Sequence, residues 1–533
     1  MVIHKVITWV QAGVVFSFFL ILNVLTSGGH LDWRDGVETF IVTESMVTMG
    51  SAKLHSDVAS IRELYGRSYD QYNGTSAPPP YYPPRSLLLS AIAVPFYYAA
   101  TALSLSPILV IGLFVNSVLI ALTSLVVFAF SVEMYGSTRI AFLLGLIFNF
   151  SSFIWPYNTS LYPQPLQGLL VISSAYLIYR SEHLHRTFIC SYSRYKINFI
   201  CSFNWVASRH FYVIASSVLI GLSVLAHPSS IILIPGFIAY FVFRPVIFSR
   251  KALITFLLSL AVVILLVGLV NSMRFNSFTE FGYYGYGSIT VHGGWEGVLG
   301  LLVSPGFGIL WYFPPVILVP FAIRGLIRKK ESRHIAFLVV YISIATLLFF
   351  GTLSYDEPVS WSGAFAWGPR YMILLLPFFV VALGSLVHGL GRRHFLQALA
   401  ISVLCVSGFF VNMIGKLVWV SYVANYIWEK LGLPTIAANY WSIVAWNPFY
   451  SPVILHLRVL TESFLSQIQP EYYHGTVNHY VNYGLLPCSY DVYLFCNFGI
   501  IPVLGTCGVA AVLGSFILMM KNNRRDFNTN GNY

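Results

Sequence analysis

Acidic side chains gather directly after the first long apolar run of this chain, and they are the groups in the sequence best suited to chemistry. The run covers residues 6–27, which is long enough to cross a bilayer once as a helix. Asp32, Asp35 and Glu38 follow it within a short polar stretch. A carboxylate held at a water–membrane boundary can take a proton from a hydroxyl group. The stretch therefore predicts binding or catalysis where the first crossing emerges.

The composition places these acids in a polytopic membrane protein. Of the 533 residues, 57% are hydrophobic and only 9% are charged, whereas about a quarter of a soluble domain is charged. The first apolar run lacks a small-residue cleavage site and is longer than a signal core, so we predict a retained signal-anchor helix. A net charge of +11 would suggest nucleic acid as the partner of a soluble protein. Here we expect no nucleic-acid partner, because the basic residues lie between apolar runs, where they indicate the orientation of the chain in the membrane.

Most Lys and Arg residues fall in clusters between apolar runs, and this pattern predicts the orientation of the chain. Positive charge between crossings is retained on the cytoplasmic side of a membrane. For the clusters to lie on that side, two apolar segments must fail to cross: residues 87–102, which contain Pro95, and residues 297–308, which contain Ser304-Pro305-Gly306. The clusters are Lys5, residues 180–209, Arg244 with Arg250 and Lys251, residues 324–333, Arg392 with Arg393, and residues 521–525.

This topology predicts an all-α protein surrounded by membrane lipid, with about twelve crossing helices, both termini in the cytoplasm and the long polar loops on the outer face. We expect a transmembrane module over residues 1–400, with a first outer loop over residues 28–106. Residues 401–533 would add C-terminal helices and an outer segment, 416–496, folded on the membrane surface. A transporter more often places its polar groups near the midplane on broken helices, and no internal repeat in the sequence supports that architecture.

Two short features of the predicted outer segments concern covalent chemistry. Cys488 and Cys496 are the only two of the six cysteines that both fall on the outer side, where a disulfide is stable. Their spacing permits a small disulfide loop before the last helix, with two separate buried thiols as the alternative. Asn73-Gly74-Thr75 and Asn158-Thr159-Ser160 match the acceptor pattern for N-glycosylation, which short sequences also produce by chance.

Motifs rich in aromatic, Pro and charged residues mark the predicted outer loops in order along the chain. They begin with Asp35-Gly36-Val37-Glu38-Thr39-Phe40, Glu44-Ser45-Met46 with Gly50, and Tyr82-Pro83-Pro84. They continue with Trp155-Pro156-Tyr157, Tyr162-Pro163-Gln164-Pro165-Leu166, Arg274-Phe275, Glu280-Phe281-Gly282-Tyr283, Ser304-Pro305-Gly306, Trp311-Tyr312 and Trp367-Gly368-Pro369-Arg370-Tyr371. The ordered set, which covers roughly residues 1–390, resembles GT-C glycosyltransferases of the protein O-mannosyltransferase and aminoarabinose transferase type, in which an Asp follows the first helix.

The resemblance implies a GT-C fold and a defined chemistry. Enzymes of this family take a sugar from a polyprenyl or dolichyl phosphate carrier at the outer membrane face and transfer it, with inversion, to a hydroxyl acceptor. Such a reaction requires a base on the acceptor and cations on the departing phosphate. The resemblance makes Asp35 the base and Arg370, with Arg85 or Arg274, the phosphate contacts, because a planar guanidinium matches phosphate oxygens. The sequence leaves the sugar open, and the acceptor could be a protein, a glycolipid or a polysaccharide.

Each of these residues also has a plainer interpretation. Asp35 could be a solvated loop acid or a helix N-cap, and Glu38 could order the loop or face the acceptor. Arg370 could anchor the start of a helix at the membrane interface, and Arg274 could simply pair with Glu280. His227 precedes a proline, so it fits a turn at a helix end as well as a substrate contact.

Two positions depart from the family pattern. Gly36 stands where a second acid is often found, and Gln164 stands where the family commonly has an acid. The Gln164 amide can orient a substrate hydroxyl, but it cannot ionise or help to bind a divalent metal. No Asp-x-Asp, His-x-x-x-His or Cys cluster supplies a metal site elsewhere, so we predict a mechanism without metal or cofactor, while a divalent metal stays open. The alternatives to an enzyme are a membrane transporter or lipid-linked sugar translocator, and a non-catalytic relative that only binds the carrier.

Overall fold

The computed structural model of this chain is a bundle of long helices, and the residues that it describes contain no strand. α6 (Pro107–Tyr135) and the helix formed by η6 (Arg370–Leu375) and α16 (Leu376–His388) lie at the centre, since 72% of the apolar window of each is buried. By contrast, α17 (Phe395–Leu417) and α23 (Ile500–Met519) bury only 17% of theirs, which leaves apolar surface for lipid.

The structure describes residues 8–31, 33–53, 82, 85–192, 199–244, 248–282, 294–352, 360–363, 366–389, 395–418, 420, 423, 440–466 and 491–520.

Seven helices in the described residues are long and apolar enough to cross a membrane. Shorter apolar helices add to them, among them α1 (Trp9–Leu25), α7 (Thr138–Phe150) and η2 (Pro228–Leu233) with α10 (Ile234–Val242). The predicted all-α membrane class is thus confirmed, whereas the total of about twelve crossings depends on which shorter helices cross and stays a prediction. The seven are α6, the part Arg209–Ala226 of α9 (Phe199–Ala226), α11 (Arg250–Phe275), α15 (Arg333–Thr352), η6 with α16, α17 and α23.

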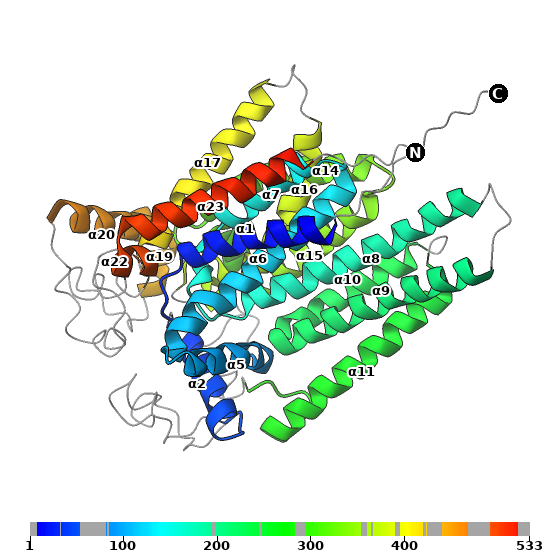
Figure 1. The fold of residues 1–533 in the computed structure, drawn as a ribbon, viewed down its shortest axis with the longest axis horizontal. Coiled ribbons are helices and arrows are strands. Elements are labelled where there is room, and N and C mark those ends of the chain that lie inside the picture. Colours follow the sequence, from blue (N-terminus) through cyan, green and yellow to red (C-terminus); the bar gives the residue numbers. More distant parts are fainter. Residues whose placement is uncertain are drawn as a thin grey trace.

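Three groups of helices surround the centre (Figure 1). α9 packs between α8 (Gln164–Tyr192) and α11, while α1 and α23 lie along each other. α2 (Trp33–Thr48) and α5 (Leu87–Ala102) pack against each other and against the start of α6. The other described helices are η1 (Trp155–Asn158), α12 (Gly294–Val303), α13 (Ile309–Tyr312), η4 (Pro314–Leu318), α14 (Val319–Arg328), η5 (Ser360–Ser362), α19 (Tyr440–Trp446), η7 (Pro448–Tyr450), α20 (Pro452–Ser466) and α22 (Tyr493–Phe498).

α2 is an amphipathic helix inside the segment that the sequence predicted only as an outer loop. Asp35 lies in its first turn, where the helix dipole favours a carboxylate. Its apolar residues recur at helical spacing and are buried against α5, which fixes the direction of the polar face. The packed residues are Val37, Phe40 and Ile41 of α2 with Leu89 and Ala93 of α5.

Gly36 allows α2 to approach the chain that leads into α8. A Cβ atom at this position would lie 3.4 Å from the backbone nitrogen of Leu161, which is ordinary van der Waals contact. A longer acidic side chain would be directed at this packed backbone. Position 36 of this chain therefore faces Leu161.

The two segments that were expected not to cross are short helices. α5 has 16 residues with Pro95 inside it, and the Ser86 hydroxyl caps it by accepting the Leu89 N–H at 3.2 Å. α12 ends at Val303, directly before Ser304-Pro305-Gly306. Their failure to cross the membrane stays a prediction.

Ion pairs join the helix segments that were predicted to be cytoplasmic. Glu133, near the end of α6, lies 3.7 Å from Arg180 of α8. Glu182 accepts hydrogen bonds from Tyr240 of α10 and from Arg244. Arg180 lies about 24 Å along α8 from the start of that helix. Arg180 and the start of α8 are therefore separated by more than half of the length of this helix.

A buried ion cluster connects the C-terminal segment to the predicted first outer loop. Asp491 lies 2.7 Å from Nε2 of His30 and 3.6 Å from Nζ of Lys416. Lys416 also donates a hydrogen bond to the Thr159 hydroxyl. Burial alone would raise the pKa of Asp491, but Lys416 and His30 hold it below its usual value. The cluster keeps Asp491 ionised and joins four separate segments of the chain.

Lys416→Met is expected to lower the free energy of unfolding by about 3 kcal/mol, because it leaves a buried carboxylate without one of its partners. Thermal unfolding of the purified protein in detergent measures this loss. The double variant Lys416→Met/Asp491→Leu should recover most of it, since no charge then needs a partner. A single variant as stable as the wild type would contradict the structural role of the cluster.

The predicted disulfide and the predicted glycosylation sites differ in how the structure bears on them. Cys496 is disulfide-bonded in the structure, and its expected partner, Cys488, lies outside the described residues, as does the glycosylation pattern at Asn73. The glycosylation pattern at Asn158 was wrongly interpreted as an outer-face site. The Asn158 side chain is fully buried and donates hydrogen bonds to the Asn23 carbonyl at 2.8 Å and to the Thr26 hydroxyl at 3.0 Å. An oligosaccharide cannot be attached to it in the folded protein.

Candidate active site

Polar segments from seven helices or turns enclose a cavity of about 260 Å³ at the α2 end of the bundle. It lies where α2 and α8 begin, before α5, after α9, at the ends of α11 and α15, and at the start of η6. One predicted site residue, Glu38, lies behind this wall, and Asp32 is outside the residues described. The other predicted site residues all line the cavity, namely Asp35, Arg85, Gln164, His227, Arg274 and Arg370.

Asp35 lies between two arginines. Its Oδ1 is 2.9 Å from Nη2 of Arg85, and its Oδ2 is 2.8 Å from Nη1 of Arg370. The side chain keeps 26% of its surface exposed at the cavity wall. The geometry is that of a carboxylate held by two cations, rather than that of a freely solvated loop acid.

Glu38 holds Arg85 from the other side. It follows Asp35 at the spacing that places two residues on one helix face. Its carboxylate lies 2.7 Å from Nε of Arg85, and its side chain is only 1% exposed. Arg85 therefore bridges both acids of α2. This contact favours the ordering role of Glu38 over contact with an acceptor.

Arg370 begins the central helix and turns its side chain toward Asp35. Its guanidinium lies over the rings of Tyr162 and Tyr371, 5.2 Å from each centroid. Gly363 makes room for it, because a Cβ there would lie 2.9 Å from Arg370 Cγ, and its φ of +81° is readily adopted by glycine. An arginine that anchors a helix at the interface extends toward water, so the geometry disfavours that alternative.

Arg274 supports Arg85 from the end of α11. Its Nη2 donates a hydrogen bond to the Arg85 carbonyl at 3.2 Å, and its guanidinium stacks over the Phe275 ring, 4.6 Å from the centroid. Arg274 thus fixes the backbone of Arg85 and adds positive charge to the cavity wall.

His227 lines the cavity as the N-cap of η2, and its contact with the Ser229 N–H favours one tautomer. Nδ1 accepts the backbone N–H of Ser229 at 3.4 Å and lies 2.7 Å from the Ser229 hydroxyl. That hydroxyl accepts a hydrogen bond from Nε2 of Gln167 at 3.1 Å, and its own hydrogen can be donated to an Nδ1 that is the acceptor of the Ser229 N–H. A neutral ring with Nδ1 as acceptor carries its hydrogen on Nε2. His227 therefore caps a turn and also offers an N–H donor to a ligand in the cavity.

The stability of the protein should fall between pH 7 and pH 5 because of His227. Burial, aided by Arg370, lowers the pKa of His227 from 6.5 to about 4, against a weaker opposing effect of Asp35. Between these values the unfolded state binds a proton that the folded state does not, so stability is lost as the pH falls through this window. The expected loss is about 2 kcal/mol. Thermal unfolding at pH 7 and at pH 5 measures this loss of stability. His227→Gln cannot titrate, so it should lack the part of the loss that is due to His227. Equal pH dependence of the wild type and the variant would contradict this role of His227.

Gln164 places a neutral amide in the cavity wall. Its side chain is 3% exposed, and its Oε1 has no hydrogen-bond partner among the described residues. A buried acceptor without a partner costs about 1–3 kcal/mol, which a hydroxyl donor on a ligand would recover. The described residues contain no group of three His, Cys, Asp or Glu that could hold a metal ion. Independence from metal stays a prediction.

Several wall residues could not be found from the sequence. The rings of Phe350 and Tyr371 stack with centroids 4.2 Å apart and form an aromatic side of the cavity. Tyr371 belongs to a motif noted in the sequence, whereas Phe350 lies in an apolar helix where nothing distinguishes it. Gln167 and Ser229, which orient His227, gave no signal because their role depends on a contact between distant segments.

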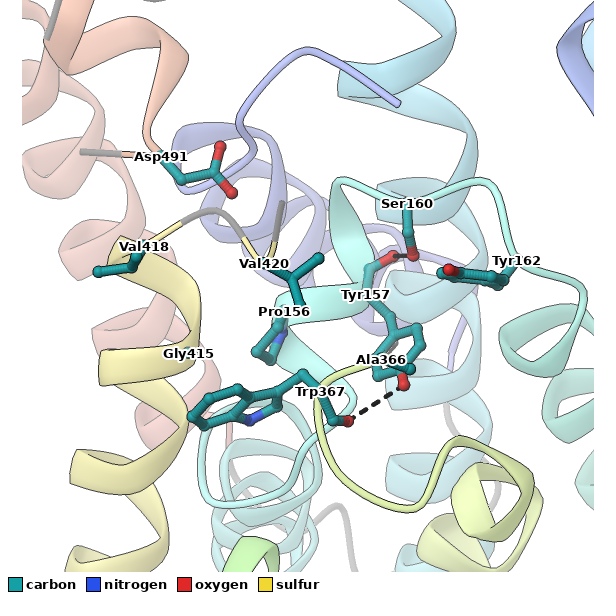
Figure 2. Close-up of a pocket in the computed structure, with 10 residues that line it drawn as sticks. All are labelled: Pro156, Tyr157, Ser160, Tyr162, Ala366, Trp367, Gly415, Val418, Val420 and Asp491. Atoms are coloured by element: carbon teal, nitrogen blue, oxygen red, sulfur yellow. Dashed lines mark hydrogen bonds between the residues drawn. The ribbon is translucent and has the colours of Figure 1, made fainter. Parts of the chain in front are cut away.

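A second, much smaller cavity of about 20 Å³ lies behind Tyr162. Figure 2 shows Asp491 and Tyr162 on opposite sides of it, with the Tyr157 hydroxyl donating to the Trp367 carbonyl at 3.1 Å between them. A space of this size holds about one water molecule.

Comparisons with known proteins return structural similarity alone. No protein-family model matches the chain, and no curated protein matches it. ArnT from Cupriavidus metallidurans in complex with undecaprenyl phosphate is similar, with 14% identity over 96% of this chain and 77% of that chain and a TM-score of 0.46. The apo state of ArnT is similar with 13% identity over 93% of this chain and 88% of that chain and a TM-score of 0.47. AglB, an archaeal oligosaccharyltransferase from Archaeoglobus fulgidus in complex with an inhibitory peptide and a dolichol-phosphate, is also similar. The identity is 11% over 84% of this chain and 60% of that chain, with a TM-score of 0.41. Because these scores are low, the functional argument rests on the geometry of the site.

Proposed function

We propose that this chain is a membrane glycosyltransferase of the GT-C type. It transfers a sugar from a polyprenyl or dolichyl phosphate carrier to a hydroxyl group of a protein, glycolipid or polysaccharide, with inversion at the sugar. The observation that carries the proposal is the Asp35 carboxylate between Arg85 and Arg370 in the wall of the cavity. A base and phosphate-binding cations are the groups that this reaction requires.

Each step of the reaction has a residue of the cavity to support it. The acceptor oxygen attacks the anomeric carbon opposite the phosphate, and Asp35 takes the proton of the acceptor hydroxyl. The bond between the anomeric carbon and the phosphate oxygen breaks, and the phosphate leaves with the bonding electrons. Arg370 and Arg85 stabilise the phosphate through charge-assisted hydrogen bonds. His227 donates a hydrogen bond from Nε2 to an oxygen of the donor, and its low pKa keeps it neutral while it does so.

The charges around the cavity match a lipid-linked sugar phosphate. Arg85, Arg274 and Arg370 bring three positive charges, while Asp35 and Glu38 bring two negative charges. One positive charge is left, and a sugar phosphodiester carries one negative charge. The described arginines of the wall therefore suit an anionic lipid phosphate.

The proposal is tested by the transfer of radiolabelled sugar from polyprenyl-phosphate donors into a cell-envelope extract. Membranes containing the wild type are compared with membranes containing Asp35→Asn at the same protein level. Transfer by the wild type alone is the expected result. A folded wild type that transfers none of several donor sugars would contradict the proposal.

A non-catalytic protein that binds the lipid carrier is the second candidate function. Gln164 favours it, since an amide stands where the resembled enzymes commonly have an acid. Binding of the carrier without transfer to any acceptor would support this function. A translocator is distinguished from both by flux of an unmodified lipid-linked sugar across proteoliposomes.

We also propose that the cavity opens on the extracytoplasmic face and that both termini are cytoplasmic. The support is the alternation of basic clusters with apolar runs and the separation of Arg180 from the cavity along α8. Single cysteines at exposed Met49, directly after α2, and at exposed Arg324 of α14 test this orientation. An impermeant thiol reagent should label the first in intact cells and the second only after permeabilisation; the reverse pattern would contradict the proposed orientation.

A further inference from the structure

Asp35 holds a position in the structure that hinders its use as a base. Both of its carboxylate oxygens are within hydrogen-bond distance of an arginine, at 2.9 Å for Arg85 and 2.8 Å for Arg370. Two neighbouring cations favour the ionised form of a carboxylate and make it a poor proton acceptor. Asp35 must therefore leave at least one arginine before it can take a proton from an acceptor hydroxyl.

The same two arginines are the groups that would bind the donor phosphate. A carboxylate and a phosphate both accept paired hydrogen bonds from the planar guanidinium fork. Asp35 takes Nη2 of Arg85 and Nη1 of Arg370, so a phosphate that binds through these two nitrogens competes with it. Among the described residues, Arg370 has no acidic partner other than Asp35. It is therefore the arginine whose partner must be exchanged.

Asp35 and Glu38 differ in their freedom to move away. The Glu38 side chain is 1% exposed and is held against Arg85 inside the packed face of α2, whereas the Asp35 side chain is 26% exposed and lines the cavity. Asp35 has the space of the cavity beside it, into which a change of side-chain rotamer would turn it. Glu38 keeps Arg85 in place when Asp35 leaves.

We propose that Asp35 occupies the position of the donor phosphate until the donor binds, and that the phosphate then displaces it from Arg370 and Arg85 and frees it to act on the acceptor. This inference rests on the proposed function. It makes the lipid-linked phosphate both a substrate and the activator of the base. An acceptor that arrives first meets a carboxylate that is still paired, so the donor must bind before the acceptor.

The test is equilibrium binding of a polyprenyl phosphate to the purified protein in nanodiscs at pH 7.5. Asp35→Asn removes the competing charge, so we expect it to bind the lipid about tenfold more tightly than the wild type does. Glu38→Gln is the matched control, since it also removes one negative charge beside Arg85 but leaves Asp35 on Arg370. It should bind no more tightly than the wild type.

Each outcome decides between the possibilities. Equal or weaker binding by a folded Asp35→Asn variant would overturn the inference, and so would equally tight binding by Glu38→Gln. If Asp35→Asn does not fold, Asp35→Ala carries the same expectation. Tighter binding by the Asp35 variant, combined with no sugar transfer by the wild type, would support the exchange and refute the enzyme. Absence of binding by every variant and by the wild type would overturn both.

Discussion

Asp35→Asn is expected to lower sugar transfer by about 10²–10⁴-fold, the range typical for loss of a general base. The amide keeps the size of the side chain, and it can still accept a hydrogen bond from an arginine, but it cannot take a proton from the acceptor. The loss should appear in kcat, because the base acts only in the transition state. Initial rates of transfer at saturating donor measure it.

The matched control for this variant is Glu331→Gln, which removes an exposed acid on the short connection between α14 and α15. Its transfer rate should equal that of the wild type. A kcat for Asp35→Asn within a factor of about five of the wild-type value would show that another group accepts the proton. The melting temperature of each variant separates a loss of chemistry from a loss of fold.

The charged residues of the candidate site could be predicted from the sequence because they belong to the motifs of the predicted outer loops. Asp35 and Arg370 are 335 residues apart in the chain, and their assignment to one site required both the alternation of apolar runs and the order of the motifs. The structure brings them within 2.8 Å. Arg85 and Arg274 were named with less definite roles, since only packing shows that one contacts Asp35 and the other supports its backbone.

The parts that could not be predicted depend on contacts between distant segments. α2 has too few apolar residues to cross a membrane, so a search for membrane-length runs treats it as loop; its helix is stabilised by burial of Val37 and Phe40 against α5. The orientation of His227 depends in the same way on Gln167, which lies one turn after the start of another helix. The buried state of Asn158 also has no local signal, because a glycosylation pattern says nothing about burial.

Arg370→Ala is expected to lower sugar transfer by about 10²–10³-fold, comparable to the loss of one donor that stabilises a developing anion. Arg370 places its guanidinium 2.8 Å from Asp35, and its position over the rings of Tyr162 and Tyr371 fixes the direction of its N–H groups. Because it would contact the phosphate of the donor before and after the sugar leaves, the variant should also bind a polyprenyl phosphate more weakly. Rates of transfer and equilibrium binding measure the two effects.

Arg370→Lys separates charge from geometry at the same position. A lysine keeps the positive charge but offers a single ammonium group in place of a planar fork, so it should recover binding more than it recovers the rate of transfer. Arg324→Ala, which removes an exposed arginine of α14, is the control and should change neither quantity. If Arg370→Ala kept wild-type binding and transfer, the phosphate would have to be held by Arg85 and Arg274 instead. Asp35 would then remain paired with Arg370 throughout the reaction, and the exchange proposed above would be excluded together with the role of Arg370.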